Sequence, residues 1–381
     1  MKNDPLPEAH LYRDCKRFTP SDLDCDLTNC YRIPKIAMGQ YQNLLFEFEL
    51  FTREAPSCHV HTLIQSHKLL GMTHIALNKT DLMVHPLCLG GNVFGWSADE
   101  TQSFAVLNAY TEHNGNFIDT ADVYSEWKDG NTGHDSERIL GKWMKQRGHR
   151  SEIVIATKVA KLSTRPGLSA ANINAAVEDS LRALQSDYID IYYSHEDDKT
   201  VPLRETLAAY DALIKSGKVR YIAASNYTGE RLAEALEISK SEGFAQYIAL
   251  QNQYNLLVRE EYEEDAAPVV IAEGISGIPF FGLARGFLSG KYRRGEVVDS
   301  IRAAGVADYQ NDRGYKVVAL LEEIAKQHGT SISAVALGWL AAQPGVATPI
   351  ASARTVEQLQ EIVTFTALTI EDIAALSDLT N

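Results

Sequence analysis

From residue 72 to the end of the 381-residue chain, short β-rich runs alternate with longer amphipathic stretches. Eight runs have the length and composition of buried strands: Pro86–Leu89, Phe117–Asp119, Ile153–Thr157, Tyr188–Tyr193, Val219–Ala224, Ile248–Gln251, Ile275–Phe280 and Ala347–Ile350. In the middle of the chain successive runs begin about thirty residues apart, the size of one strand–helix unit. Eight such units predict an α/β fold with a single (β/α)8 domain, a TIM barrel.

The stretches between these runs carry apolar residues at helical spacing, and helices are expected over 136–146, 169–184, 202–216 and 228–241. An open, doubly wound sheet is the main alternative fold. Its first strand is usually followed by a GxGxxG turn, and the glycines of residues 89–95 do not have that spacing. We therefore expect residues 89–95 to form a barrel loop.

Residues 1–71 lack the organisation of the rest of the chain. They show no sustained period of two or of 3.6 residues, and four of the five cysteines lie there without a CxxC pair. Their spacing supports neither a disulfide framework nor a zinc site well. We expect an irregular extension ahead of a barrel at 72–381: either an upstream translation artefact, with Met72 as the true start, or a real accessory segment.

The net charge of −14 narrows the possible partners. Nucleic-acid binding requires clustered Lys and Arg, so no nucleic-acid partner is expected. No run of 18 or more apolar residues and no basic-then-apolar N-terminal signal is present, so we expect neither a membrane span nor secretion. A reduced, cytoplasmic protein is the simplest interpretation of the cysteine usage. An anionic cofactor remains possible, because a local Arg or a helix N-terminus can bind phosphate.

Four polar residues lie at or shortly after the ends of consecutive expected strands. Asp119 ends the run 117–119 and Tyr124 follows it, while Lys158 and His195 follow the next two runs. In a (β/α)8 barrel the C-terminal strand ends meet at one mouth, so these side chains can gather there. Lys158, held by Asp119, is expected to lower the pKa of Tyr124 and so make it a proton donor to a carbonyl oxygen. His195 could donate to the same oxygen or relay a proton.

These positions resemble the aldo-keto reductase family. The resemblance rests on NFIDTADVY at 116–124, on TK at 157–158 and on YSH at 193–195, and it covers residues 72–381. It implies a (β/α)8 barrel that binds NADP(H) without a Rossmann domain and needs no metal. It also implies a catalytic tetrad of Asp119, Tyr124, Lys158 and His195.

The resemblance further implies cofactor contacts on the later strands, at Ser225, Asn226, Gln251, Phe280, Leu283, Arg285, Lys291, Ser352, Arg354 and Gln358. The first three would contact the nicotinamide carboxamide, although Ser225 and Asn226 could also start a helix, since both residue types are good caps. Phe280 stands where the family commonly has a stacking Tyr, and an aromatic face is all that stacking needs.

The remaining contacts would hold the phosphates and the adenine. Lys291 and the backbone near it would cradle the pyrophosphate, and Ser352 and Arg354 suit the 2′-phosphate that distinguishes NADP from NAD. Gln358 would reach the adenine. The sequence departs from the family's pattern in two places: Gly282 replaces a usual Pro, and Ile362 replaces an Asn that often contacts adenine.

The resemblance implies an oxidoreductase acting on CH–OH donors, which reversibly reduces a small aldehyde or ketone to an alcohol with Tyr124 as the acid. Phe94, Trp96 and Trp127 are expected to line an apolar substrate pocket. Two alternatives stay open. One is a nicotinamide-binding, redox-sensing regulatory subunit with slow turnover, like the potassium-channel β subunits of the family. The other is a physiological alcohol dehydrogenase.

Overall fold

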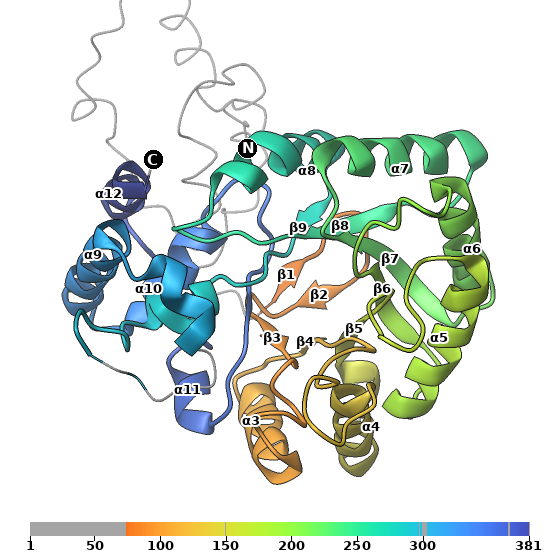
Figure 1. The fold of residues 1–381 in the computed structure, drawn as a ribbon, viewed down its shortest axis with the longest axis horizontal. Helices are drawn as coiled ribbons and strands as arrows, with labels where there is room; N and C mark the ends of the chain where they lie inside the picture. The colour runs from red at the N-terminus through yellow and green to blue at the C-terminus, as the bar shows by residue number, and fades with distance from the viewer. Residues whose placement is uncertain (1–73, 149, 297, 299–302, 365, 381) are drawn as a thin grey trace, which may run out of the picture. The chain divides into compact units, whose positions relative to one another are not determined.

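The computed structural model describes residues 74–381 apart from 149, 297, 299–302, 365 and 381. The extension expected at 1–71 lies outside the described residues. Eight parallel strands form one sheet in the order β10-β3-β4-β5-β6-β7-β8-β9 (Figure 1). Their bounds are β3 Cys88–Gly90, β4 Phe117–Asp119, β5 Val154–Val159, β6 Ile189–Ser194, β7 Val219–Ser225, β8 Tyr247–Gln251, β9 Ser276–Gly277 and β10 Ile350–Ala351.

The sheet closes on itself between β9 and the segment that leads into β10. The amide of Ala347 donates to the carbonyl of Gly277 at 2.8 Å, and the amide of Ile350 donates to the carbonyl of Pro279 at 2.9 Å. The closed ring of eight parallel strands confirms the (β/α)8 barrel. The expected runs 275–280 and 347–350 are longer than the strands found there, because only two residues of β9 pair in register with β8 and only two residues of β10 pair in register with β3.

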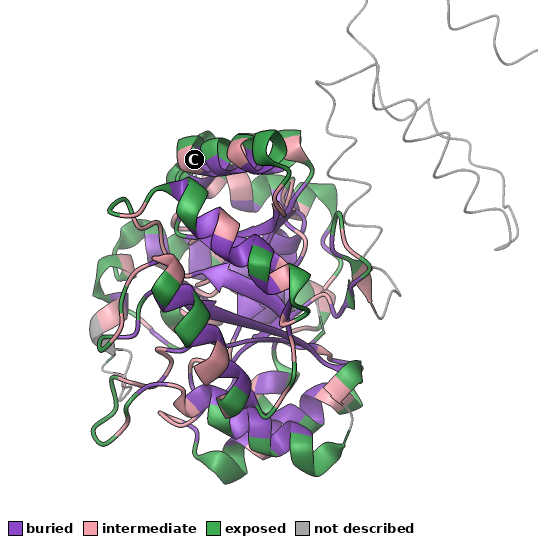
Figure 2. Cartoon of the chain, turned by 90° about the vertical axis from the view of Figure 1, so that its right-hand side faces the viewer, coloured by how far each residue is buried: buried purple, intermediate pink, exposed green. Residues whose placement is uncertain are grey.

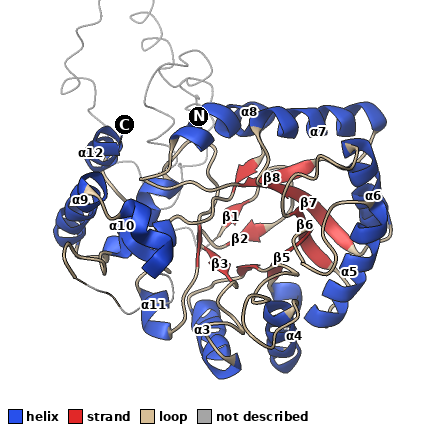
Figure 3. Ribbon diagram, in the orientation of Figure 1, coloured by secondary structure: helices blue, strands red, loops and turns tan. Residues whose placement is uncertain are grey.

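Helices surround the strands, as Figure 3 shows by the blue ring around the red sheet. The α-helices are α3 Glu100–Glu112, α4 Asp135–Arg147, α5 Ala170–Leu184, α6 Leu203–Lys215, α7 Gly229–Glu242, α8 Ala267–Glu273, α9 Asp312–His328, α10 Ile332–Ala341, α11 Val356–Gln360 and α12 Ile370–Thr380. Four of them, α4 to α7, lie where the sequence predicts helices. In α5 the Ser169 side chain accepts the amide of Asn172 as an N-cap, and Ile173, Val177 and Leu184 are buried on one face.

Two apolar clusters fill the barrel and its surroundings, and Figure 2 shows the buried strands beneath helices that are green on their outer faces. The larger cluster lies between the strands and the helices. The smaller one contains Phe117 of β4, Ile191 of β6 and Ile278, which directly follows β9, together with Leu77 and Val84 from a hairpin before the barrel. Apolar burial of this extent is the main favourable contribution to folding such a domain.

That hairpin consists of β1 Ile75–Ala76 and β2 Met83–Val84, which pair antiparallel and were not expected from the sequence. The amide of Asn78 donates to Ser276 Oγ at 3.0 Å, and the amide of His85 donates to Asn116 Oδ1 at 2.8 Å. Ser276 begins β9 and Asn116 precedes β4, so the hairpin covers the N-terminal ends of the strands. The C-terminal ends are left open for a site.

Among the described helices, none is both long enough and apolar enough to cross a bilayer.

Candidate active site

The Lys158 ammonium is the centre of a hydrogen-bonded group at the C-terminal mouth of the barrel. Its Nζ lies 2.7 Å from both carboxylate oxygens of Asp119 and donates to the Tyr124 hydroxyl oxygen at 2.9 Å. It also donates to the carbonyl of Thr120 at 2.7 Å. Lys158 is fully buried. A buried ammonium is stable only when its donors are satisfied, and these three partners satisfy them.

Tyr124 is held by the turn that follows β4. The amide of Asp122 donates to the carbonyl of Lys158 at 3.1 Å, which ties the turn to β5. Ser125, at a φ of 74°, donates its hydroxyl to the carbonyl of Phe94 at 2.7 Å. The Tyr124 hydroxyl donates to Asp119 Oδ2 at 3.1 Å, so the phenol and the ammonium share one carboxylate.

The surroundings of Tyr124 raise the pKa of its phenol, whereas a lowered pKa was expected from the sequence. Burial, followed by the nearby Asp119 charge, raises the pKa of Tyr124 well above its usual value of 10. Burial also lowers the pKa of Lys158, and the Asp119 carboxylate opposes that shift. Sequence reasoning considered only the ammonium and could not weigh burial or the facing carboxylate. The phenol is consequently held in its protonated, donor form.

His195 lies beside Tyr124, with ring centroids 5.9 Å apart. Burial and the positive charges of Lys158 and Lys161 lower the pKa of His195 well below 6.5, so the imidazole is neutral. Its amide donates to the carbonyl of Val159 at 2.9 Å, which fixes the residue directly after β6. Its Nδ1 is buried and has no hydrogen-bond partner among the described residues. A neutral imidazole can donate one N–H to an oxygen.

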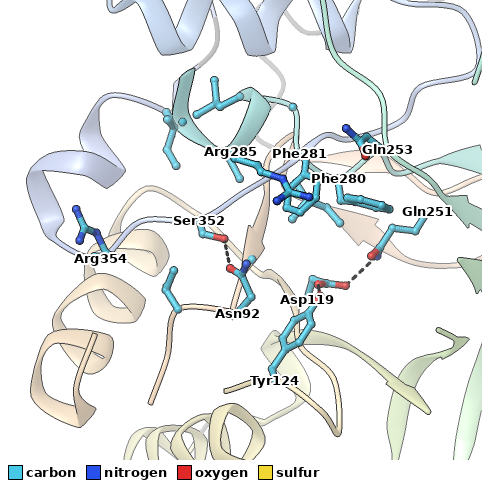
Figure 4. Close-up of a pocket in the computed structure, with 18 of the residues that line it drawn as sticks. Asn92, Asp119, Tyr124, Gln251, Gln253, Phe280, Phe281, Arg285, Ser352 and Arg354 are labelled. Carbon is cyan, nitrogen blue, oxygen red and sulfur yellow. Dashed lines mark hydrogen bonds between the residues drawn. The ribbon is translucent and has the colours of Figure 1, made fainter. Parts of the chain in front are cut away.

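A cavity of about 680 Å³ opens above this group. All ten residues expected to contact the cofactor line it: Ser225, Asn226, Gln251, Phe280, Leu283, Arg285, Lys291, Ser352, Arg354 and Gln358. Asp119, Tyr124 and His195 line it as well, while Lys158 lies beneath. Figure 4 shows Tyr124 and Asp119 on one side of the cavity and Arg354 at the far end. Residues at or after the ends of all eight strands therefore meet in one place.

Gln251 connects the two halves of the site. It ends β8, and its Nε2 donates to Asp119 Oδ1 at 2.9 Å (Figure 4). Ser225 Oγ donates to the carbonyl of Gln251 at 2.8 Å, and Asn226 Nδ2 donates to the carbonyl of His195 at 2.8 Å. The alternative role of Ser225 and Asn226 as a helix start is not realised, because Thr228 is the N-cap of α7.

The loop after β9 bends sharply around the cavity. Phe281, Ala284 and Arg285 have φ values of 56°, 45° and 58°, a left-handed conformation that is uncommon for residues other than glycine. The Arg285 guanidinium lies 4.7 Å from the Phe281 ring centroid, a cation–π distance. Phe280 is half-buried and lines the cavity. Strained backbone of this kind often accompanies binding sites.

At the far end, Ser352 Oγ donates to Asn92 Oδ1 at 2.7 Å, and Gln358 Oε1 accepts the amide of Arg354 at 3.0 Å. Thr355 caps α11. This segment therefore both caps α11, through Thr355, and contributes Arg354 and Gln358 to the cavity wall. Ile362 also lines the cavity, so an apolar side chain stands where the family often has Asn.

Several lining residues were missed from the sequence: Asn92, Lys161 and Gln253. Asn92 and Lys161 follow β3 and β5, and Gln253 follows β8, so proximity to a strand end was the available signal. Phe94 was wrongly expected to line the substrate pocket, since it is fully buried in the core. Trp127 does line the cavity, and Trp96 contacts it edge-on with ring centroids 5.6 Å apart.

The residues present fit a nicotinamide dinucleotide cofactor. Arg285, Lys291 and Arg354 line the cavity from the segments after β9 and β10, and three cations of this kind suit phosphate groups. Amide and hydroxyl groups from Ser225, Asn226 and Gln251 lie near the tetrad, where a carboxamide needs donors and acceptors. Across the described part of the chain, no group of three or more His, Cys, Asp or Glu side chains is arranged to hold a metal ion.

Comparison with known proteins points the same way. The sequence model of the aldo/keto reductase family matches residues 86–381. The chain is 33% identical to an uncharacterized oxidoreductase, YrpG, of Bacillus subtilis, over 77% of this chain and 90% of that protein. It is 29% identical to a norsolorinic acid reductase of Aspergillus flavus, over 81% of each chain. It is 30% identical to a probable voltage-gated potassium channel subunit beta of Arabidopsis thaliana, over 76% of this chain and 90% of that protein.

Proposed function

Because the chain belongs to the aldo-keto reductase family, we propose that it is an NADP(H)-dependent oxidoreductase that reversibly reduces an aldehyde or ketone to an alcohol. It is thus an enzyme acting on CH–OH donors in the oxidative direction. The observation that carries the proposal is the Lys158 ammonium, bonded at once to Asp119 and to the Tyr124 hydroxyl at the wall of the cavity.

When bound, reduced NADP supplies a hydride to the carbonyl carbon. Phe280 offers a half-buried aromatic face on which a nicotinamide ring can stack, and Gln251, Ser225 and Asn226 offer groups that fix its carboxamide. Arg354 and Ser352 would hold the 2′-phosphate, with Arg285, Leu283 and Lys291 along the pyrophosphate and Gln358 at the adenine. These roles orient the reactive ring toward Tyr124.

Tyr124 acts as the general acid for the carbonyl oxygen. Its raised pKa keeps the phenol protonated at neutral pH but opposes release of the proton, so transfer depends on the negative charge that develops on the carbonyl oxygen. Lys158 donates to the phenol oxygen at 2.9 Å and therefore stabilises the phenolate that forms. Asp119 holds Lys158 in place at 2.7 Å.

His195 positions the carbonyl group. A neutral imidazole keeps one N–H donor, and the half-buried ring faces the same cavity as Tyr124. Two donors aimed at one oxygen polarise it before hydride transfer. The backbone bond from His195 to Val159 fixes this donor relative to β5, which carries Lys158.

Tyr124→Phe tests the proposal, because it removes the proton and keeps the ring. Turnover of a panel of aldehydes, ketones and quinones, followed by NADPH absorbance at 340 nm, should fall by roughly 10²-fold or more. NADPH affinity, measured by fluorescence titration, should change little, because the substitution removes only the hydroxyl that donates the proton and none of the groups assigned to the cofactor. Retained turnover in this variant would refute the role of Tyr124.

One relative is named as a probable channel subunit beta, so a regulatory function is tested in the same assay. A nicotinamide-binding, redox-sensing subunit would bind NADPH tightly, and single-turnover experiments would show slow oxidation of the bound NADPH. A physiological alcohol dehydrogenase would instead oxidise alcohols with NADP at steady-state rates that exceed the reductive ones at cellular cofactor ratios.

The proposal assigns this activity to residues 72–381, supported by the family match from residue 86. We propose a small carbonyl or alcohol as the substrate and the cytoplasm as the site of action. Subcellular fractionation of the native host checks the location, and intact mass checks whether residues 1–71 belong to the mature chain.

A further inference from the structure

Lys161 is the cation that faces the substrate end of the cavity and has no part in the proposed reaction. It lines the same cavity as Tyr124 and His195, and about 40% of its side chain is exposed. The other cations on the wall, Arg285, Lys291 and Arg354, belong to the segments after β9 and β10. An exposed ammonium beside the reacting group can select substrates by charge.

The loops on either side fix Lys161 near the reactive centre. It follows β5 by two residues, and the carbonyl of Val159 accepts the His195 amide at 2.9 Å. Ser163 Oγ donates to Glu126 Oε1 at 2.5 Å, which joins the loop of Lys161 to the turn that carries Tyr124. The charge of Lys161 is close enough to contribute to the lowered pKa of His195.

An apolar wall completes this end of the cavity. Trp127 lines it, is 49% exposed, and lies with its ring centroid 6.2 Å from that of Tyr124. Trp96 supports Trp127 edge-on at 5.6 Å. A large exposed tryptophan in a cavity offers a contact face for an apolar or planar part of a ligand.

Lys161 already forms an ion pair with an acidic side chain of the protein. Its Nζ lies 3.1 Å from Glu196 Oε2, and the Glu196 side chain is 44% exposed. A half-exposed ion pair of this kind contributes little to stability and can exchange one partner for another. A substrate anion can therefore replace Glu196 on Lys161 at small cost.

From this arrangement we infer that the carbonyl substrate carries an anionic group, such as a carboxylate, which pairs with Lys161 while its apolar part contacts Trp127. The inference rests on the proposed reductase function and adds the substrate class. The chain carries a net charge of −14, so its long-range field repels anions, and a local cation is needed to favour one at the mouth.

The test compares two matched substrates, 4-formylbenzoate and its neutral methyl ester, in the full-length protein with NADPH. The ratio of kcat/KM for the acid to kcat/KM for the ester should fall roughly three- to fivefold in Lys161→Gln. It should rise a few-fold in Glu196→Gln, which frees Lys161. Lys199→Gln removes an exposed lysine outside the cavity lining and should leave the ratio unchanged.

Any effect of the lost charge on His195 acts on both substrates and cancels in the ratio. The preference of the wild-type protein for the acid should also weaken with added salt, as a half-exposed ion pair requires. A ratio that is the same in wild type and Lys161→Gln overturns the inference.

Binding of 4-formylbenzoate, followed by quenching of tryptophan fluorescence, separates this inference from the proposed function. Binding of the acid that weakens in Lys161→Gln supports an anion site even if neither substrate is reduced, in which case only the proposed reductase function fails. Reduction of the ester together with equal binding of the acid to both proteins leaves the reductase function standing and refutes the anion site.

Discussion

Asp122→Asn should remove a pH-dependent loss of stability that is built into the turn carrying Tyr124. Asp122 is 1% exposed, and neither of its carboxylate oxygens has a hydrogen-bond partner among the described residues. Burial, and then the neighbouring Glu137, raise its pKa from 3.8 to about 7, while His134 and Arg165 oppose the shift. The folded protein therefore resists ionising this group.

The sign and size of the effect follow from linkage. With the pKa raised on folding, the stabilising contribution is fully present below about pH 4 and is lost as pH rises to about 7. A shift of about three pKa units at 1.36 kcal/mol per unit corresponds to about 4 kcal/mol, an order-of-magnitude value. Asparagine cannot ionise, so the variant lacks this slope and gains stability relative to wild type as pH rises.

The assay is urea unfolding followed by circular dichroism at 222 nm, at intervals between pH 4.5 and 8.5. The difference in unfolding free energy between Asp122→Asn and wild type should grow with pH up to about pH 7 and then level off. Asp129→Asn, an exposed aspartate of the same loop, serves as the control and should follow wild type. Parallel curves for Asp122→Asn and wild type would show that folding does not raise the pKa of Asp122, and the reasoning would fail.

Two further predictions concern the cofactor and the fold. Arg354→Ala should weaken NADPH binding by roughly tenfold or more and leave NADH binding nearly unchanged, because only NADPH carries the 2′-phosphate; equal losses for the two cofactors in fluorescence titrations would contradict this role. Gly141→Ala should destabilise the barrel by about 2 kcal/mol or more, since a Cβ there would lie 2.2 Å from the carbonyl oxygen of Ala183 on α5. Its urea midpoint should drop well below that of Lys142→Ala, an exposed change on the same helix, and a shared midpoint would contradict the close helix contact.

Much of the fold could be predicted from the sequence because local patterns encode it. The spacing of the β-rich runs and the apolar faces of residues such as Ile173 and Val177 require helices that cover a parallel sheet. The hairpin at β1 and β2 was not predictable in this way, since each strand has only two residues and its position depends on partners such as Ser276, about 200 residues away in the chain.

The candidate site could be predicted as a set of residues but not as an electrostatic environment. Position at a strand end was enough to identify Asp119, Lys158 and His195 as candidates, because parallel strands in a barrel present their C-terminal ends at one mouth. The role of Lys161 was missed, since nothing in the local pattern distinguishes it from a solvated lysine. Phe94 was misjudged because a loop position does not reveal whether the ring turns inward.

The sequence by itself determined the order and kind of elements, the barrel and the four side chains at its mouth, because these depend on periodicity and on strand ends. Only the tertiary structure decided the protonation of those side chains. Burial and the Asp119 charge together raise the pKa of Tyr124, against the expectation drawn from Lys158 alone. Both depend on desolvation and on distances between residues far apart in the chain, which no local pattern specifies.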